Sequence, residues 1–300
     1  MLGLRRGTVA LYPHETAWEA EAARTIRQLK EILGDAATEI RHVGSTAIRS
    51  IKAKPIVDIA VAAADFDRVL ALREPLERAG FYCRPGSLEG QLLFARGSYY
   101  GGTGDLQTHF IHVVKAGGED WNNYVRFVAY CNARPAVAKA YEALKVALAE
   151  ACPVDEGREQ YLAGKHDFIR RTLREAAAWA LLGQRAHIVI DRPVGYVHRT
   201  GAHETVYPVN YGFWPGVPGG DGEDQDVYLL GVDEPVAEAD AVVIGVVLRK
   251  NDAEDKLIAA PAGVSFTKEE MARAVRFQER WFETELLTRE EDRPRGEPAI

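Results

Sequence analysis

The stretch that decides the fold of the last third of the chain contains YPVNYGF (207–213) and DGEDQDVYLL (221–230). Asp221, Glu223, Asp224 and Asp226 lie within six residues and lead into an apolar strand. Carboxylates this close repel one another, so some are driven to protonate unless a cation neutralises them. Mg²⁺ accepts such oxygen ligands and completes its shell with waters and substrate phosphates. The pattern predicts a Mg²⁺-dependent phosphate site, although the acidic residues alone are also typical of a solvated turn.

Around this stretch, from Ala186 onward, the sequence consists of short β-type segments separated by Gly, Pro and Asp turns. This alternation predicts a small, OB-like β-barrel, closed by a helix over Thr267–Thr288. The polar, proline-rich residues 289–300 predict a loose tail. We therefore expect an N-terminal domain over residues 1–183, a barrel domain over 186–288 and a tail over 289–300.

In the N-terminal part, helical patterns alternate with strand-like segments, which predicts an α+β domain with a mixed sheet. Thr16-x-x-Glu19 is a capping-box pattern that opens a helix ending at Gly34. A strand over Glu39–Val43 and the nearly continuous apolar run Pro55–Ala62 follow, and only Asp58 interrupts that run. Further helices are predicted over 66–80, 119–131, 135–151 and 157–182, with strands near Phe81 and over 92–95 and 106–114.

The composition limits the classes of protein to which the chain can belong. The 300 residues are 47% hydrophobic with a net charge of −7, which predicts two globular domains and does not favour nucleic acid as a partner. Cys83, Cys131 and Cys152 lack metal-binding spacing, so we expect buried free thiols. No apolar run approaches the ~20 residues that span a bilayer, and the N-terminus lacks a signal-peptide pattern. We expect a soluble, cytoplasmic protein with no membrane partner, and the sequence leaves an oligomer open.

YPVNYGF followed by DGEDQDVYLL resembles the signature of family I soluble inorganic pyrophosphatases, in which YPxNYG precedes D-G-D-x-x-D. The resemblance covers about 186–285. It implies that Asp221, Glu223 and Asp226 chelate Mg²⁺, with Glu223 replacing the middle Asp. It also implies that Tyr211 is the active-site tyrosine, that Asp226 orients a metal-bound water and that Lys256 offsets the charge of the product phosphates.

The same resemblance is weaker for the residues that would hold diphosphate. A second acidic loop offers Asp252, Glu254 and Asp255 as further metal ligands, and their pairing with the family's carboxylates stays open. Asp191 matches an acidic residue of the first hairpin. The family's Lys and Arg on the phosphates have no clean match, and Arg192 and Arg199 are the candidates. The closing helix has Arg280-Trp281-Phe282 where the family has a Tyr-Lys pair.

HVGSTAI (42–48) followed by AKPIVDI (53–59) resembles the GrpB family, a nucleotidyltransferase-like group. Trp18, Arg126 and Tyr161-x-x-x-Lys165-x-x-Phe168 extend the resemblance over most of residues 8–180. It implies a phosphate-binding turn and a metal-binding carboxylate at Asp58. The residues it assigns to phosphate or nucleotide binding are Gly44, Ser45, Thr46, Lys54, His42 and His112. Ala60 stands where a polymerase-β-type pattern has its second carboxylate, and His109 and His112 are candidates to supplement Asp58.

These observations predict an enzyme that uses Mg²⁺ to hydrolyse diphosphate, or a related phosphoanhydride, in its C-terminal domain. The N-terminal domain would bind a nucleotide or another phosphate ligand, so the expected partner is a small phosphorylated substrate. Two alternatives stay open. Both domains could bind a nucleotide or phosphorylated metabolite without turnover, or the N-terminal domain could carry out nucleotidyl transfer.

Overall fold

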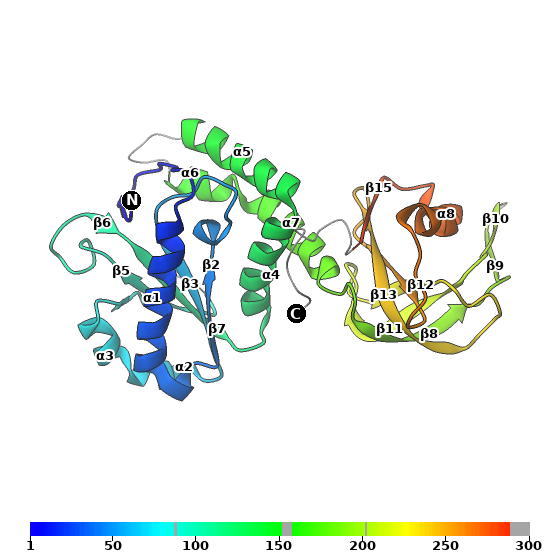
Figure 1. The fold of residues 1–300 in the computed structure, drawn as a ribbon, viewed down its shortest axis with the longest axis horizontal. Helices are drawn as coiled ribbons and strands as arrows, with labels where there is room; N and C mark the ends of the chain where they lie inside the picture. Colours follow the sequence, from blue (N-terminus) through cyan, green and yellow to red (C-terminus); the bar gives the residue numbers. More distant parts are fainter. Residues whose placement is uncertain (87–88, 152–157, 202, 289–300) are drawn as a thin grey trace. The chain divides into compact units, whose positions relative to one another are not determined.

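The computed structural model describes residues 1–86, 89–151, 158–201 and 203–288 (Figure 1). The chain divides into two compact units, Met1–Leu173 and Arg174–Ile300. The division falls inside helix α7 (His166–Trp179), whereas the sequence pattern placed the domain boundary after residue 183. The predicted tail, 289–300, lies outside the described residues.

A five-stranded mixed sheet forms the centre of the N-terminal unit, as the sequence predicts. Its order is β2 (Glu39–Val43), β3 (Val57–Ala63), β7 (His109–Lys115), β5 (Leu92–Arg96) and β4 (Tyr82–Cys83). β3 and β7 are parallel, and the other neighbours are antiparallel. A separate two-stranded sheet pairs β1 (Leu4–Arg5), near the N-terminus, with β6 (Leu106–Gln107), which directly precedes β7 in the chain.

Helices cover both faces of this sheet because β3 is apolar on both sides. On one face, Val57, Ile59 and Val61 pack with α1 (Thr16–Leu33), α2 (Phe66–Ala71) and α3 (Arg73–Arg78). On the other, Ala60 and Ala62 pack under α4 (Glu119–Ala133). Helices α5 (Pro135–Ala151) and α6 (Arg158–Ala163) complete the unit, with short 3₁₀ turns at Gly34–Ala36 and Ser45–Ala47.

Several helix boundaries differ from the sequence-based expectation. The Thr16 capping box does not form, because Glu15 is the N-cap and its carboxylate pairs with the N-terminal amine. The helix predicted over 66–80 breaks at Leu72, which places Pro75 in the first turn of α3, where a missing N–H is tolerated. The helix predicted over 157–182 is interrupted between α6 and α7, around Gly164.

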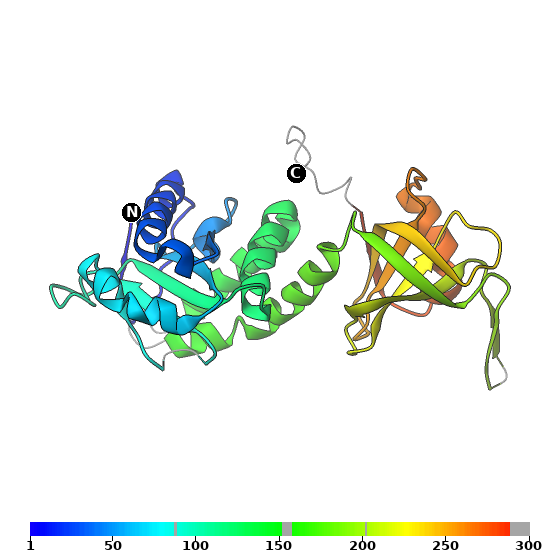
Figure 2. The ribbon, with the colours of Figure 1, turned by 90° about the horizontal axis from the view of Figure 1, so that it is seen from below.

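The C-terminal unit is built on a closed five-stranded barrel, the β-barrel that the sequence predicts. β8 (Arg185–Arg192), β11 (Asn210–Pro218), β12 (Asp224–Leu229), β14 (Lys256–Ala260) and β13 (Glu238–Arg249) pair in a ring. Only β12 and β14 are parallel among these pairs. A hairpin of β9 (Val197–Thr200) and β10 (His203–Val206) extends from the barrel (Figure 2).

The closing helix is shorter than predicted. α8 spans Lys268–Glu279 and begins at a capping box formed by Thr267 and Glu270. Residues 284–287, predicted as helix, instead form β15 (Thr284–Leu287), which pairs with β13. β13 extends beyond its pairing with β8, so its last residues have an unpaired edge. Residues 284–287 pair with that edge as a strand instead of continuing a helix. Met271 of α8 packs against the barrel cluster that contains Tyr228.

Two further expectations concern the cysteines and membranes. Cys131 is a buried free thiol, Cys83 is a free thiol that is only partly buried, and Cys152 lies outside the described residues. None of the helices that the structure describes is both long and apolar enough to cross a bilayer.

A buried ion pair links α8 to the barrel. Arg249, only 3% exposed, donates from Nε to Glu279 at 2.9 Å and from Nη2 at 2.6 Å. Tyr228 donates its hydroxyl to the same carboxylate at 2.5 Å, and the Arg249 guanidinium stacks on Phe282 at 3.7 Å. Burial and the Glu279 charge raise the pKa of the Tyr228 hydroxyl, so Tyr228 acts as a donor.

Breaking this pair is expected to destabilise the barrel strongly. Arg249→Met leaves the Glu279 carboxylate buried without its cation, which costs about 3–5 kcal/mol. The double variant Arg249→Met/Glu279→Leu removes both charges, so its loss in unfolding free energy should be smaller. Denaturant titration of the three proteins checks this. A double variant at least as unstable as the single one would contradict the account.

Candidate functional site

The register of two strands places the Gly-Ser turn beside Asp58. Val43, the last residue of β2, pairs with Asp58 of β3, so the turn that follows β2 starts next to that carboxylate. Gly44 has φ 70° and ψ −171°, a region open essentially to glycine. A Cβ at Gly44 would lie 2.4 Å from Asp58 Oδ2. Only glycine therefore allows the turn to lie directly against the strand carboxylate.

A cavity of about 450 Å³ opens in front of this turn and strand. Four residues that the sequence assigned to ligand binding line it together: Ser45, Lys54, Asp58 and His112. The described lining also includes three further basic residues and several aromatic ones, namely Arg6, Arg84, Lys165, Tyr99, Tyr100, Phe110 and Tyr161. Its volume lies within the ~300–1,000 Å³ typical of small-molecule sites.

Each basic residue of the cavity lies against an aromatic ring. The ammonium nitrogens of Lys54 and Lys165 lie 4.2 and 4.5 Å from the centroid of the Tyr161 ring. The guanidinium of Arg6 lies 4.6 Å from the Tyr99 ring. The Arg84 guanidinium lies 5.4 Å from the Tyr100 ring. Such contacts hold long cationic side chains in defined positions.

Asp58 is joined to a short chain of polar groups. Its Oδ1 lies 3.5 Å from His112 Nε2, and His112 Nδ1 lies 3.0 Å from the Tyr124 hydroxyl. Tyr124 also donates to Gln91 at 3.3 Å. Burial, with a smaller effect of the Asp58 charge, raises the pKa of Tyr124 and keeps its hydroxyl protonated. His112 is thus held on both ring nitrogens and orients towards Asp58.

His42 and Thr46, also predicted to bind phosphate, do not line the cavity. His42 Nε2 lies 3.0 Å from the Thr46 hydroxyl, which in turn donates to the Ile56 carbonyl at 3.3 Å. Burial lowers the pKa of His42 to about 4, so it is neutral near pH 7. These contacts hold the turn against the segment before β3. His109 faces α1, where its Nε2 lies 3.1 Å from the Glu21 carboxylate.

Sequence reasoning missed Arg6 and Arg84 and gave Lys165 and Tyr161 only as family matches. Arg6 follows a two-residue strand, and Arg84 follows another, so neither lies in a periodic element that could be placed in advance. Lys165 sits between α6 and α7. Its four-residue separation from Tyr161 was the one available signal, because residues four apart on a helix share a face.

The barrel brings together four residues that the sequence assigned to phosphate chemistry. The Lys256 ammonium pairs with both Asp226 and Glu254, and the buried Tyr211 hydroxyl bonds to Asp226. Burial and the neighbouring Asp226 raise the pKa of Glu254 to about 7. Although burial opposes ionisation of Asp226, hydrogen bonds from Glu254, Lys256 and Tyr211 hold its pKa below the usual value.

The remaining acidic residues either pair with other cations or lie exposed, apart from this cluster. Arg249 pairs with Asp252 at 3.1 Å, and Arg174 of α7 binds Asp255 through two nitrogens at 2.6 and 3.0 Å. Asp221 and Glu223 are exposed and bond to each other through the Glu223 amide at 3.0 Å. The two acidic loops do touch, since a Cβ on Gly220 would lie 2.0 Å from the Ala253 carbonyl.

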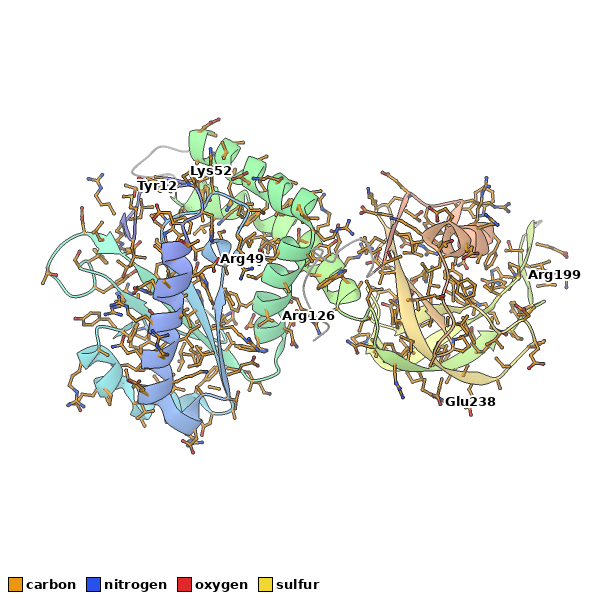
Figure 3. The ribbon with its side chains drawn as sticks, in the orientation of Figure 1. Tyr12, Arg49, Lys52, Arg126, Arg199 and Glu238 are labelled. Carbon is orange, nitrogen blue, oxygen red and sulfur yellow. The ribbon has the colours of Figure 1, made fainter. Side chains whose placement is uncertain are left out.

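The basic candidates of the barrel are split between two places. Arg192 donates to the Tyr207 hydroxyl at 2.9 Å, and its guanidinium lies 5.1 Å from the Tyr211 ring. It therefore stands next to the Tyr211 cluster, with Asp191 alongside it at 3.9 Å. Arg199 lies on the β9–β10 hairpin, where it pairs with Glu204 at 2.6 Å (Figure 3).

This arrangement decides whether the acidic residues could bind Mg²⁺ as they stand. Within the described part of the chain, no three His, Cys, Asp or Glu side chains are gathered closely enough to hold a metal ion. In the barrel, the nearest carboxylates are already compensated by Lys256, Arg249 and Arg174. The donor types suit Mg²⁺, but the geometry is not that of an assembled metal cradle.

The N-terminal unit is an α+β domain in which a Gly-Ser turn lies against a strand carboxylate. Residues 8–175, more than half of the chain, match the family model described as GrpB protein. The chain therefore belongs to the GrpB family.

The chain is similar to one curated relative and two solved structures as follows. The glutamate-rich protein GrpB of Alkalihalophilus pseudofirmus is 36% identical over 181 residues, which cover 58% of this chain and 99% of that protein. The crystal structure of GrpB from Enterococcus faecalis, 26% identical, covers 56% of this chain and 96% of that chain with a TM-score of 0.49. The inorganic pyrophosphatase of Ehrlichia chaffeensis, 20% identical, covers 36% and 87% with a TM-score of 0.30.

The close approach of Gly44 to Asp58 generates a test with a matched control. Gly44→Ala and Gly117→Ala both place a side chain at positive φ, +70° and +67°, but a Cβ at Gly117 meets no atom within 4 Å. Both variants should lose about 1–2 kcal/mol of stability, because alanine strains a backbone at positive φ. Gly44→Ala should lose at least about 2 kcal/mol more, because its ψ lies in a region open essentially to glycine and because Asp58 must move. Thermal unfolding compares them, and equal losses would contradict the contact.

Proposed function

We propose that the N-terminal unit binds a small phosphorylated molecule in the cavity beside Asp58. The observation that carries this proposal is the convergence of Arg6, Arg84, Lys54 and Lys165 on one cavity. Arginine and lysine are the side chains that recognise phosphate, through charge-assisted hydrogen bonds. Cations held against aromatic rings lose little further conformational freedom when an anion arrives, which favours affinity.

Binding, rather than nucleotidyl transfer, is the activity that this geometry favours. Two-metal transfer needs carboxylates that clamp both metal ions. Two residues after Asp58, on the same face of β3, stands Ala60, which is fully buried under α4 in an apolar cluster with Trp121. Among the described residues that line the cavity, Asp58 is the one carboxylate. Within the described lining, nucleotidyl transfer would therefore have one carboxylate for its metal ions.

Removing one cavity cation should weaken ligand binding. Lys54→Met is expected to reduce the affinity of the full chain for a nucleotide by about tenfold, since one charge-assisted hydrogen bond contributes roughly 1.5–3 kcal/mol. Calorimetric titration measures this. Lys52→Met removes the same charge two residues away, from an exposed side chain outside the cavity lining, and should bind as the unmodified protein does (Figure 3). Equal affinities for the two variants would refute the assignment of the site.

A second candidate function is hydrolysis of diphosphate, or of a related phosphoanhydride, by the barrel with Mg²⁺. The observation that favours it is the cluster of Tyr211, Asp226, Glu254 and Lys256 beside two acidic loops in contact. In such a site Tyr211 and Lys256 would contact phosphate oxygens, and Arg192 is near enough to Tyr211 to join them. Asp221 and Glu223 would have to close on Asp226 to bind a metal, so we assign no step to Mg²⁺.

Phosphate release decides between hydrolysis and binding alone. If the barrel is a hydrolase, the full chain with Mg²⁺ releases inorganic phosphate from diphosphate or from a nucleoside triphosphate. Asp226→Asn should then abolish release, because it removes the carboxylate that Lys256 and Tyr211 share, whereas the exposed Asp233→Asn should retain it. No release from any of these substrates by the unmodified protein excludes the hydrolase proposal and leaves N-terminal binding untouched.

A further inference from the structure

Part of the central sheet presents apolar side chains to the N-terminal cavity. Phe110 of β7, the middle strand of the sheet, and Leu93 of β5 both line the cavity, and both are only partly buried. On the opposite face of the same strands, Ile111 and Phe94 are each 1% exposed, because residues of α1 pack against them. A sheet normally covers its apolar side chains with another layer, so the open surface over Phe110 and Leu93 is available to a ligand.

Helix α4 covers this face of the sheet only further along the strands. Its Trp121 belongs to the cluster of Ala60 and Val114, whereas Asp58 and Phe110 line the cavity. Asp58 and Phe110 are register partners near the start of β3 and β7. Paired strands lie about 4.7–4.9 Å apart, so these two side chains are neighbours on one face. The floor of the cavity therefore changes from polar at β3 to apolar at β7 and β5.

Aromatic rings continue the apolar surface along the wall of the cavity. The loop after β5 carries Tyr99 and Tyr100, whose rings meet edge to face at 5.0 Å, and Tyr100 packs on Phe110 at 6.5 Å. The buried Gln107 donates to the Tyr100 hydroxyl at 2.5 Å, which fixes that ring. Leu162, 48% exposed, also belongs to the lining. Rings held in this way offer fixed faces and edges to a ring of the ligand.

Polar groups lie on the other side of the cavity. Ser45 follows β2 and Lys54 precedes β3, so both lie at the β2–β3 side of the sheet, next to Asp58. Beyond the apolar part, the Arg84 guanidinium lies 5.4 Å from the Tyr100 ring, and arginine also stacks on planar ligands. A cavity of about 450 Å³ with this arrangement fits a molecule with a polar end and an apolar end. An inorganic anion would leave the apolar side in contact with water.

We infer that the ligand of this cavity is a phosphate ester whose organic group carries an aromatic ring, and that this ring lies against Phe110, Leu93 and Tyr100. The inference rests on the proposed phosphate-binding function of the same cavity and adds the class of the organic group. Two sources share this chemistry. In an aryl phosphate the ring is bonded to the phosphate oxygen, and in a nucleoside phosphate a sugar separates the two.

Calorimetric titration of the full chain with two matched pairs of esters tests the inference. Phenyl phosphate is compared with glycerol 3-phosphate, and AMP is compared with ribose 5-phosphate. The ring-bearing ester of at least one pair should bind about tenfold or more tightly than its partner, because the ring covers apolar surface that the partner leaves in water. A gain for phenyl phosphate identifies an aryl ester, and a gain confined to AMP identifies a nucleoside.

Variants of the lining locate the ring. Phe110→Ala should weaken binding of the ring-bearing ester by about tenfold and binding of its partner by much less, and Leu93→Ala should weaken it by about threefold. Leu92→Ala is the matched control, because this adjacent leucine packs in the core on the opposite face of the sheet, and it should retain the preference for the ring. Thermal unfolding checks that each variant is folded, and the ester pairs on the unmodified protein do not depend on the variants.

The outcomes distinguish this inference from the proposed function. Equal affinities within both pairs overturn the inference, while phosphate binding by the cavity stands. A preference for the ring that is unchanged in both Phe110→Ala and Leu93→Ala also overturns it, because the ring then lies elsewhere. Binding of none of the four esters overturns the inference and the proposed function together.

Discussion

The contact between the Gly44 backbone and the Asp58 carboxylate fixes the geometry on which the N-terminal cavity depends. Strand register brings Val43 opposite Asp58, and the missing side chain at Gly44 lets the turn pack against the carboxylate. Hydrogen bonds from His42 to Thr46 and from Thr46 to Ile56 hold the turn from behind. Ser45 and Lys54 consequently face the same space as Asp58 and His112, and loops from the rest of the unit bring further cations to it.

The charged side chains of the two units are arranged differently. In the N-terminal cavity, basic side chains from several segments lie on aromatic rings around a space that a small ligand can enter. In the barrel, Lys256, Arg249 and Arg174 compensate carboxylates of the same chain, some of them in buried pairs. Buried pairs of this kind are expensive to break but are weak evidence for a binding function. We therefore prefer the open N-terminal cavity as the candidate ligand site.

The sequence predicted what depends on local pattern and missed what depends on tertiary contacts. The apolar run around Asp58 predicted a strand buried on both faces, and the Gly- and Pro-punctuated segments after Ala186 predicted the barrel; both are confirmed. β15 was missed because its pairing with β13 joins residues far apart in the chain. Arg6 and Arg84 have no local signal, and the pairing of Asp255 with Arg174 joins residues 81 positions apart. The proposed roles of Asp221, Glu223 and Tyr211 in phosphate chemistry stay predictions.

A crystal structure of the full chain grown with ADP tests the central claim most directly. The account predicts density for the phosphates between Lys54, Lys165 and the arginines of the N-terminal cavity, beside Asp58. ADP bound only in the barrel beside Lys256, or an N-terminal cavity that stays free of ligand at saturating ADP, would contradict it.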